Sequence, residues 1–142
     1  MKKIIIASGY FDPVHIGHIE YLKLSKQLGD KLVVIVNSDL QCTLKKGKPF
    51  MKQEERLEIL KSIKYVDEAM ISVDKDKSVC ETVRVIAKKF KGDKIIFAKG
   101  GDRFSNEIPE AKLCSELGIE MVDGLGQKIQ SSSSLTNLKE IK

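Results

Sequence analysis

Short apolar runs rich in β-branched residues alternate with segments of helical pattern along this chain, and this alternation restricts the possible folds most strongly. The runs occupy residues 3–8, 31–37, 68–73, 94–98 and 119–123. They are apolar at consecutive positions, which is typical of strands buried on both faces of a sheet. The segments between and after them predict helices over residues 16–28, 53–63, 78–90, 109–118 and 132–141.

Strands that alternate with helices predict a parallel sheet with helices on both faces. Because crossover connections are right-handed, we expect one doubly wound, Rossmann-like α/β domain over residues 1–142, with five strands in the order 3-2-1-4-5. The length of 142 residues fits a single domain. Ligands of such folds bind beyond the carboxyl ends of the strands, which directs attention to the loops after Ser8, Asn37, Ala98 and Asp123.

Composition excludes several classes of protein. No apolar run approaches the roughly 20 residues of a membrane span, and the first residues do not form a signal peptide, so we expect a cytoplasmic protein with no membrane partner. Three scattered cysteines without a CxxC pair predict neither a zinc site nor disulfides. The net charge of +5 is compatible with a phosphate-bearing ligand or with nucleic acid. No stripe of basic and aromatic residues is present, so we expect no nucleic-acid partner.

The first loop, GYFDPVHIGH over residues 9–18, contains both histidines of the chain. If a helix begins near Ile16, His15 and His18 lie on the same side of it. Free backbone N–H groups and the partial positive charge of the helix N-terminus point the same way, and Gly17 allows an anion to approach closely. The pattern predicts an anion cradle with two imidazole donors. The alternatives are a metal site, for which Asp12 is the only further ligand nearby, and incidental surface histidines.

Five segments in order carry a resemblance that covers nearly the whole chain. GYFDPVHIGH resembles the GxFDxxHxGH signature of the cytidylyltransferase-like nucleotidyltransferases. LGDKLVVIVNSD resembles their second strand and ribose-side turn, and KKGKPFMKQEERLEILKSIKYVDEAMI their lysine segment and following helix. FAKGGDR resembles the KGGD stretch of the heptose-phosphate adenylyltransferase branch, and QSSSSL stands in the place of the ISTT-like C-terminal motif. The glycerol-3-phosphate cytidylyltransferase branch is similarly near.

The resemblance implies an enzyme that transfers a nucleotidyl group from ATP or CTP to a phosphorylated small molecule, such as a sugar phosphate or polyol phosphate, and releases pyrophosphate. It also implies a homodimer and one Mg²⁺ ion held mainly by phosphate oxygens. The implied catalytic residues are His15, His18 and Lys48. The implied nucleotide contacts are Gly9, Tyr10, Phe11, Asp12, Gly17, Asp39, Lys45, Lys46, Gly100, Gly101, Asp102, Ser131, Ser132 and Ser133. Arg56 and Arg103 are the implied contacts of the acceptor.

Each of these segments also has a simpler interpretation. Residues 37–39 are typical of an Asx turn, residues 45–48 of a solvated basic face, and residues 100–101 of a tight turn. Arg56 is equally suited to an ion pair within its own helix. A non-catalytic nucleotide-binding module that uses the same cradle is the alternative function.

Overall fold

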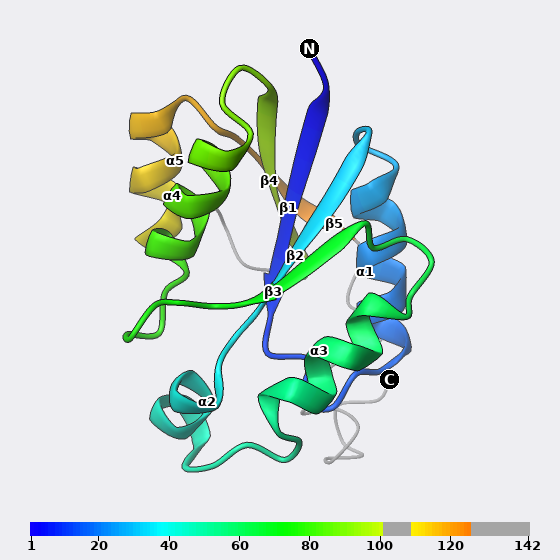
Figure 1. The fold of residues 1–142 in the computed structure, drawn as a ribbon, viewed down its shortest axis with the longest axis vertical. Coiled ribbons are helices and arrows are strands. Elements are labelled where there is room, and N and C mark those ends of the chain that lie inside the picture. The colour runs from blue at the N-terminus through cyan, green and yellow to red at the C-terminus, as the bar shows by residue number, and fades with distance from the viewer. Residues whose placement is uncertain (101–108, 126–142) are drawn as a thin grey trace.

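The computed structural model describes residues 1–100 and 109–125 of the chain. Strands and helices alternate through most of this part, as Figure 1 shows. The elements, in chain order, are β1 (Lys3–Gly9), α1 (Ile16–Lys26), β2 (Lys31–Val36), α2 (Asp39–Lys46), α3 (Gln53–Lys61), β3 (Glu68–Ile71), α4 (Cys80–Lys89), β4 (Lys94–Gly100), α5 (Pro109–Leu117) and β5 (Glu120–Leu125).

The five strands form one parallel sheet in the order β3-β2-β1-β4-β5, which confirms the predicted fold and strand order. Helices α1 and α3 cover one face of the sheet, and α4 and α5 cover the other (Figure 1). Side chains of β1 alternate between the two cores: Ile4 and Ile6 pack toward α4 and α5, whereas Ile5 and Ala7 pack toward α1 and α3. Each buried isoleucine contributes about 1.5–3 kcal/mol to stability relative to an exposed one.

Helix α2 differs from the sequence-based expectation, which had only a turn and a basic run there. Ser38 caps this helix: its side chain accepts the Gln41 N–H, while the Gln41 side chain accepts the Ser38 N–H. This reciprocal capping box starts a helix at a place where Asn, Ser and Asp in sequence suggested only a turn. Gly47 ends α2 with φ at 94°, a left-handed conformation that glycine adopts at little cost. In Figure 1, α2 lies beyond the carboxyl end of β2.

Three further expectations concern the last helix, the cysteines and membrane spans. The expected helix over residues 132–141 lies outside the described residues. All three cysteines are free thiols. In the described part of the chain, no helix combines the length and the apolarity that crossing a bilayer requires.

Candidate active site

The candidate site lies at the carboxyl ends of β1 and β4, where the strand order of the sheet reverses. The strand that follows β1 in the chain, β2, pairs with it on one side, whereas the strand that follows β4, which is β5, lies on the other side of the sheet. Loops that diverge at such a point leave a crevice, and the N-terminus of α1 is at this end of the sheet.

The two histidines cap the helix that follows them. His15 is the N-cap residue of α1, and its Nδ1 accepts the Gly17 N–H at 3.0 Å. The Nδ1 of His18 accepts the His15 N–H at 3.1 Å. Because both Nδ1 atoms are acceptors, the hydrogen bonds assign the proton of each neutral ring to Nε2, where each imidazole presents one donor. The expectation of free backbone donors is wrong for His15 and Gly17, since the imidazoles take these amides.

The imidazoles stack on one another, which confirms that both lie on the same side of the helix. Their ring centroids are 3.8 Å apart and their planes meet at 25°. Burial lowers the pKa of His15. Burial, together with the neighbouring His15, lowers the pKa of His18 to about 4. Both rings are therefore neutral at pH 7, and two Nε2–H donors stand side by side.

Phe11 supports His18 from the interior of the protein. The Phe11 side chain is buried, and its ring meets the His18 ring edge-on at a centroid distance of 4.9 Å. Phe11 has φ at 51°, an uncommon conformation for an aromatic residue. A Cβ atom at Gly9 would stand 3.0 Å from the Phe11 ring. Gly9 and Phe11, expected as nucleotide contacts, thus hold the imidazole of His18 in place.

Asp12, in the first loop, pairs with Lys46, the last residue of α2. The Asp12 carboxylate is fully buried; it pairs with the Lys46 ammonium at 2.7 Å and accepts the amides of Phe50 and Met51 at 2.7 and 2.6 Å. Burial alone would raise the pKa of Asp12, but Lys46 and the two amides outweigh it and hold the pKa below its usual value. Both ends of the segment 46–51 are therefore attached to the first loop. Lys48, between these ends, is exposed.

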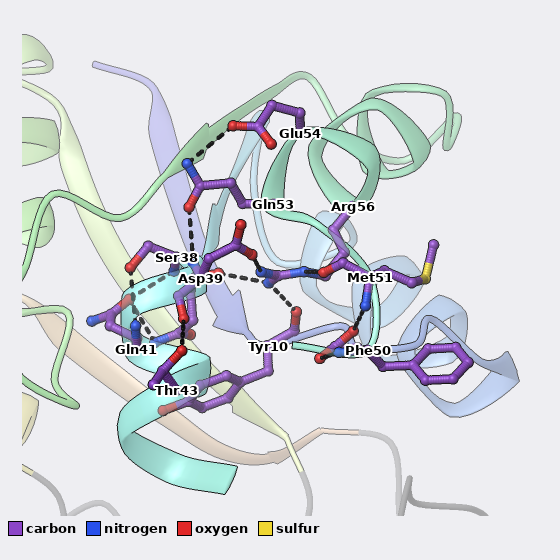
Figure 2. A network of polar contacts seen from close by, with 12 residues as sticks. Tyr10, Ser38, Asp39, Gln41, Thr43, Phe50, Met51, Gln53, Glu54 and Arg56 are labelled. Atoms are coloured by element: carbon purple, nitrogen blue, oxygen red, sulfur yellow. Dashed lines mark hydrogen bonds and ion pairs between the residues drawn. The ribbon is translucent and has the colours of Figure 1, made fainter. Parts of the chain in front are cut away.

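Arg56 lies at the centre of a polar network that joins several segments (Figure 2). Its side chain is fully buried. The guanidinium donates to the carbonyl groups of Tyr10, Asn37 and Met51 and pairs with Asp39 at 2.8 Å. These contacts join the loops that follow β1 and β2. The expected contact with the acceptor is corrected accordingly, because four of the five donors of Arg56 are used inside the protein. The expected ion pair is present, but its partner lies on α2 and not within α3.

Gln41 and Asp39 place α2 against neighbouring loops. The Gln41 amide donates to the carbonyl groups of Asp76 and Ser78 at 2.7 Å each, so that α2 is attached to the loop before α4. Asp39 keeps 36% of its side chain exposed while one carboxylate oxygen pairs with Arg56. Sequence reasoning missed Gln41. The Ser-x-x-Gln spacing of a capping box at residues 38–41 was the signal that could have revealed it.

A cavity of about 460 Å³ opens beside the first loop. The Lys45 ammonium lies 4.2 Å from the centre of the Tyr10 ring, so that two residues expected at the nucleotide meet at this cavity. The cavity is lined by Tyr10, Lys45, Asp76, Lys77, Ser78, Pro109 and Glu110. It therefore combines two lysines with hydroxyl and carboxylate groups at the carboxyl end of the sheet.

The remaining predicted residues divide into two groups. Gly100 ends β4, next to the crevice. The other six lie outside the described residues: Gly101, Asp102, Arg103, Ser131, Ser132 and Ser133.

The described carboxylates fit a metal ion held mainly by substrate. No group of three His, Cys, Asp or Glu side chains that could hold a metal ion exists within residues 1–100 and 109–125. Asp12 already has three partners, and Asp39 is paired with Arg56. Of the metals that use oxygen ligands, Mg²⁺ is the one that usually keeps waters and binds through substrate phosphates with one or two carboxylates.

The comparison with known families decides the assignment. The model of the cytidylyltransferase-like family matches residues 6–137, which include the histidine pair and the whole polar network. The chain belongs to the cytidylyltransferase-like family. It is accordingly an enzyme of the nucleotidyltransferase type.

Named relatives of this cytidylyltransferase-like chain fall into two groups. An FAD synthase from Pyrococcus abyssi is 34% identical over 119 residues, which cover 83% of this chain and 77% of the relative. The bifunctional protein HldE from Nitratiruptor sp. is 35% identical over 126 residues, which cover 87% of this chain. The matched residues make up 26% of HldE, so this chain corresponds to about a quarter of that protein.

One solved structure agrees with this family assignment, and a second one shares the fold. A lipopolysaccharide core biosynthesis protein from Thermoplasma volcanium is 30% identical, with a TM-score of 0.68 over 87% of this chain and 96% of the other. A nicotinate-nucleotide adenylyltransferase from Vibrio parahaemolyticus, described as putative, has a TM-score of 0.63 over 100% of this chain and 90% of the other. It is only 14% identical and shares the fold.

Proposed function

We propose that this enzyme transfers an adenylyl group from ATP to a phosphorylated small molecule and releases pyrophosphate. The observation that carries the proposal is the stacked histidine pair, because it places two neutral Nε2–H donors side by side at a helix N-terminus. Neutral imidazoles with a fixed tautomer suit a reaction in which negative charge moves between phosphate oxygens and no strong base is needed.

The proposed reaction is a single in-line displacement. A phosphate oxygen of the acceptor attacks the α-phosphorus of ATP, and the bond from this phosphorus to the oxygen of pyrophosphate breaks. The Nε2–H groups of His15 and His18 donate to an α-phosphate oxygen and to the bridging oxygen, where charge develops as the bond breaks. No covalent intermediate with the protein forms, so catalysis depends on positioning and charge neutralisation.

Lysines supply the positive charge around the reacting phosphates. Lys48 is exposed in the middle of a segment whose two ends Asp12 attaches to the histidine loop, and we assign its ammonium to the reacting phosphates. A Mg²⁺ ion would be held mainly by phosphate oxygens, with Asp39 as a candidate protein ligand, and would neutralise further charge.

We place the acceptor in the cavity beside Tyr10 and Lys45, which departs from the sequence-based expectation that these two residues contact the nucleotide. Lys45 and Lys77 offer charges for the acceptor phosphate, and Asp76, whose Oδ1 accepts the Ser78 N–H and hydroxyl, offers its carboxylate to hydroxyl groups of the acceptor. The relatives support ATP over CTP, since FAD contains an adenylyl group and a relative is named FAD synthase. FMN and sugar phosphates are the two acceptor classes that the relatives suggest.

Two measurements test the proposal. A thermal-shift panel of ATP, CTP, GTP and UTP with Mg²⁺ identifies the nucleotide; at 100 times its dissociation constant, ATP should stabilise the protein by about 2.7 kcal/mol. Pyrophosphate release is then measured with ATP and either FMN, glycerol 3-phosphate or a sugar 1-phosphate. Release with one acceptor and its loss in the His15→Asn variant support the proposal. Binding of ATP without release in the presence of any of these acceptors would instead favour a nucleotide-binding module.

A further inference from the structure

The sheet splits between β1 and β4 at the candidate site. These strands pair from Lys3↔Lys94 as far as Ala7↔Ala98, whereas β1 continues to pair with β2 as far as Gly9↔Val36. On the other side β4 continues with β5 to Gly100, with an irregularity after Ala98. Beyond Ala7 and Ala98, the two central strands therefore separate and the ladder between them ends.

One side-chain hydroxyl takes over the hydrogen bonds at this split. The Tyr21 hydroxyl accepts the Ser8 N–H at 3.2 Å and donates to the Ala98 carbonyl oxygen at 2.6 Å. The Tyr21 side chain is only 8% exposed, so the two backbone groups have no easy alternative in water. Burial raises the pKa of the Tyr21 hydroxyl above its usual value, so it stays protonated and can donate and accept at once.

Tyr21 also belongs to the helix that carries the imidazoles. It lies three residues after His18 on α1, which places the two side chains on the same side of the helix, one turn apart. The Ser25 hydroxyl donates to the Tyr21 carbonyl oxygen at 2.8 Å within the same helix. Helix α1 is thus connected to both central strands through a single hydroxyl group, one turn after His18.

We propose that Tyr21 is a positioning residue for the transfer reaction. Its hydroxyl spans the gap between β1 and β4 and fixes α1, whose N-terminus carries the two imidazoles, relative to the carboxyl ends of both strands. The inference rests on the proposed function. It goes further by naming Tyr21, a buried residue of α1 that touches no substrate, as the residue that holds the imidazole pair in position.

Tyr21→Phe tests the role of the hydroxyl while keeping the ring. Without the hydroxyl, Ser8 N–H and the Ala98 carbonyl lose their shared partner, and the first turn of α1 shifts. Displacements of about 1 Å near a reacting centre can reduce turnover about a hundredfold; for this indirect effect we expect kcat to fall about tenfold or more, with a smaller change in KM for ATP. Ser25→Ala is the matched control, because it removes a buried hydroxyl from the same helix without touching the gap.

The histidines provide a second readout that needs no substrate. The chain contains only two histidines, so a ¹H–¹⁵N spectrum of the imidazoles of the free protein contains two ring systems, which His15→Asn assigns. The wild-type protein and Ser25→Ala should both show two Nε2–H tautomers. Tyr21→Phe should shift the ring signals of His18 or mix its tautomers. This spectrum judges the role of Tyr21 even if no transferase activity is found, which separates it from a failure of the proposed function.

Two results overturn the inference. The first is that a folded Tyr21→Phe variant has a kcat within twofold of the Ser25→Ala control. The second is that the imidazole signals of the folded Tyr21→Phe variant are unchanged. If Tyr21→Phe does not fold, hydrogen exchange of the wild-type protein decides. The Ser8 amide should then be protected as strongly as the amides of the β1 ladder, and exchange as fast as that of an exposed amide would also overturn the inference.

Discussion

Two groups of polar residues at the carboxyl end of the sheet differ in how they use their hydrogen-bonding groups. Asp12, Lys46 and Arg56 are charged side chains whose partners belong to the protein itself. Asp12 pairs with Lys46 and two backbone amides, and Arg56 pairs with Asp39 and backbone carbonyl groups. His15 and His18 are neutral, and they use Nδ1 to cap a helix while Nε2 remains for a ligand. The charged group holds the loops together, and the neutral group presents donors. Formal charge is therefore a poor guide to which residues meet the substrate.

Arg56→Met gives the largest expected effect, and it acts on stability. Removing the guanidinium leaves three carbonyl groups and the Asp39 carboxylate without their donor, which should lower the free energy of unfolding by about 3 kcal/mol or more. Urea denaturation measures this. Arg84→Met is the control, because Arg84 is exposed and, among the described residues, pairs with Glu81 alone; it should change stability by less than about 0.5 kcal/mol. Equal effects of the two variants would contradict the scaffold role of Arg56.

The histidine variants should affect turnover rather than stability. His15→Asn and His18→Asn keep an oxygen that can accept the capped amide but lose the Nε2–H donor, so each should lower kcat at least about a hundredfold. The free energy of unfolding should change by less than about 1 kcal/mol. His15→Ala and His18→Ala should lose the same activity and additionally the cap. Near wild-type turnover in either asparagine variant would remove that histidine from the mechanism.

Lys46 and Lys48 offer a comparison within one segment. Lys46→Met removes the partner of the buried Asp12 carboxylate and should lower stability by about 1–2 kcal/mol, a value reduced by the partial exposure of Lys46. Lys48→Met makes the same change of charge two residues further on, at an exposed position. We expect it to leave the urea midpoint unchanged and to lower kcat about tenfold. The reverse pattern would show that Lys46 serves the substrate and Lys48 the scaffold.

The pH dependence of stability should show the smallest effect. The pKa of His18 is lowered to about 4 in the folded protein, against an ordinary value near 6.5, so the unfolded chain binds a proton in this range that the folded chain does not. The contribution of His18 to the free energy of unfolding is therefore fully present above about pH 6.5. It is lost as the pH decreases toward 4, by roughly 1–2 kcal/mol after allowance for solvent screening. Urea midpoints at pH 7.5 and 5 measure the decrease. His18→Asn should flatten this slope, and an unchanged slope would place its origin elsewhere.

The architecture could be read from the sequence because its signals are local. Continuous β-branched runs mark strands that are buried on both faces, and the five runs lie in the five observed strands or overlap them. The histidine spacing likewise placed both imidazoles on one side of a helix. Helix α2 was missed because the preference of Asn37, Ser38 and Asp39 for turns outweighed the weaker capping-box spacing. The site residues expected at 101–103 and 131–133 lie outside the described part of the chain and stay predictions.

The sequence alone determined a parallel doubly wound sheet and the loop at which a phosphate-bearing ligand is expected. These follow from periodicity and spacing, which are properties of neighbouring residues. Only the tertiary structure decided that Asp12 and Arg56 belong to the scaffold and that Tyr21 closes the split between β1 and β4. Their partners are far away in the chain: Asp12 meets an amide 38 residues later, and Tyr21 a carbonyl 77 residues later. Whether a polar group is left for a ligand depends on such distant partners, and no local pattern contains them.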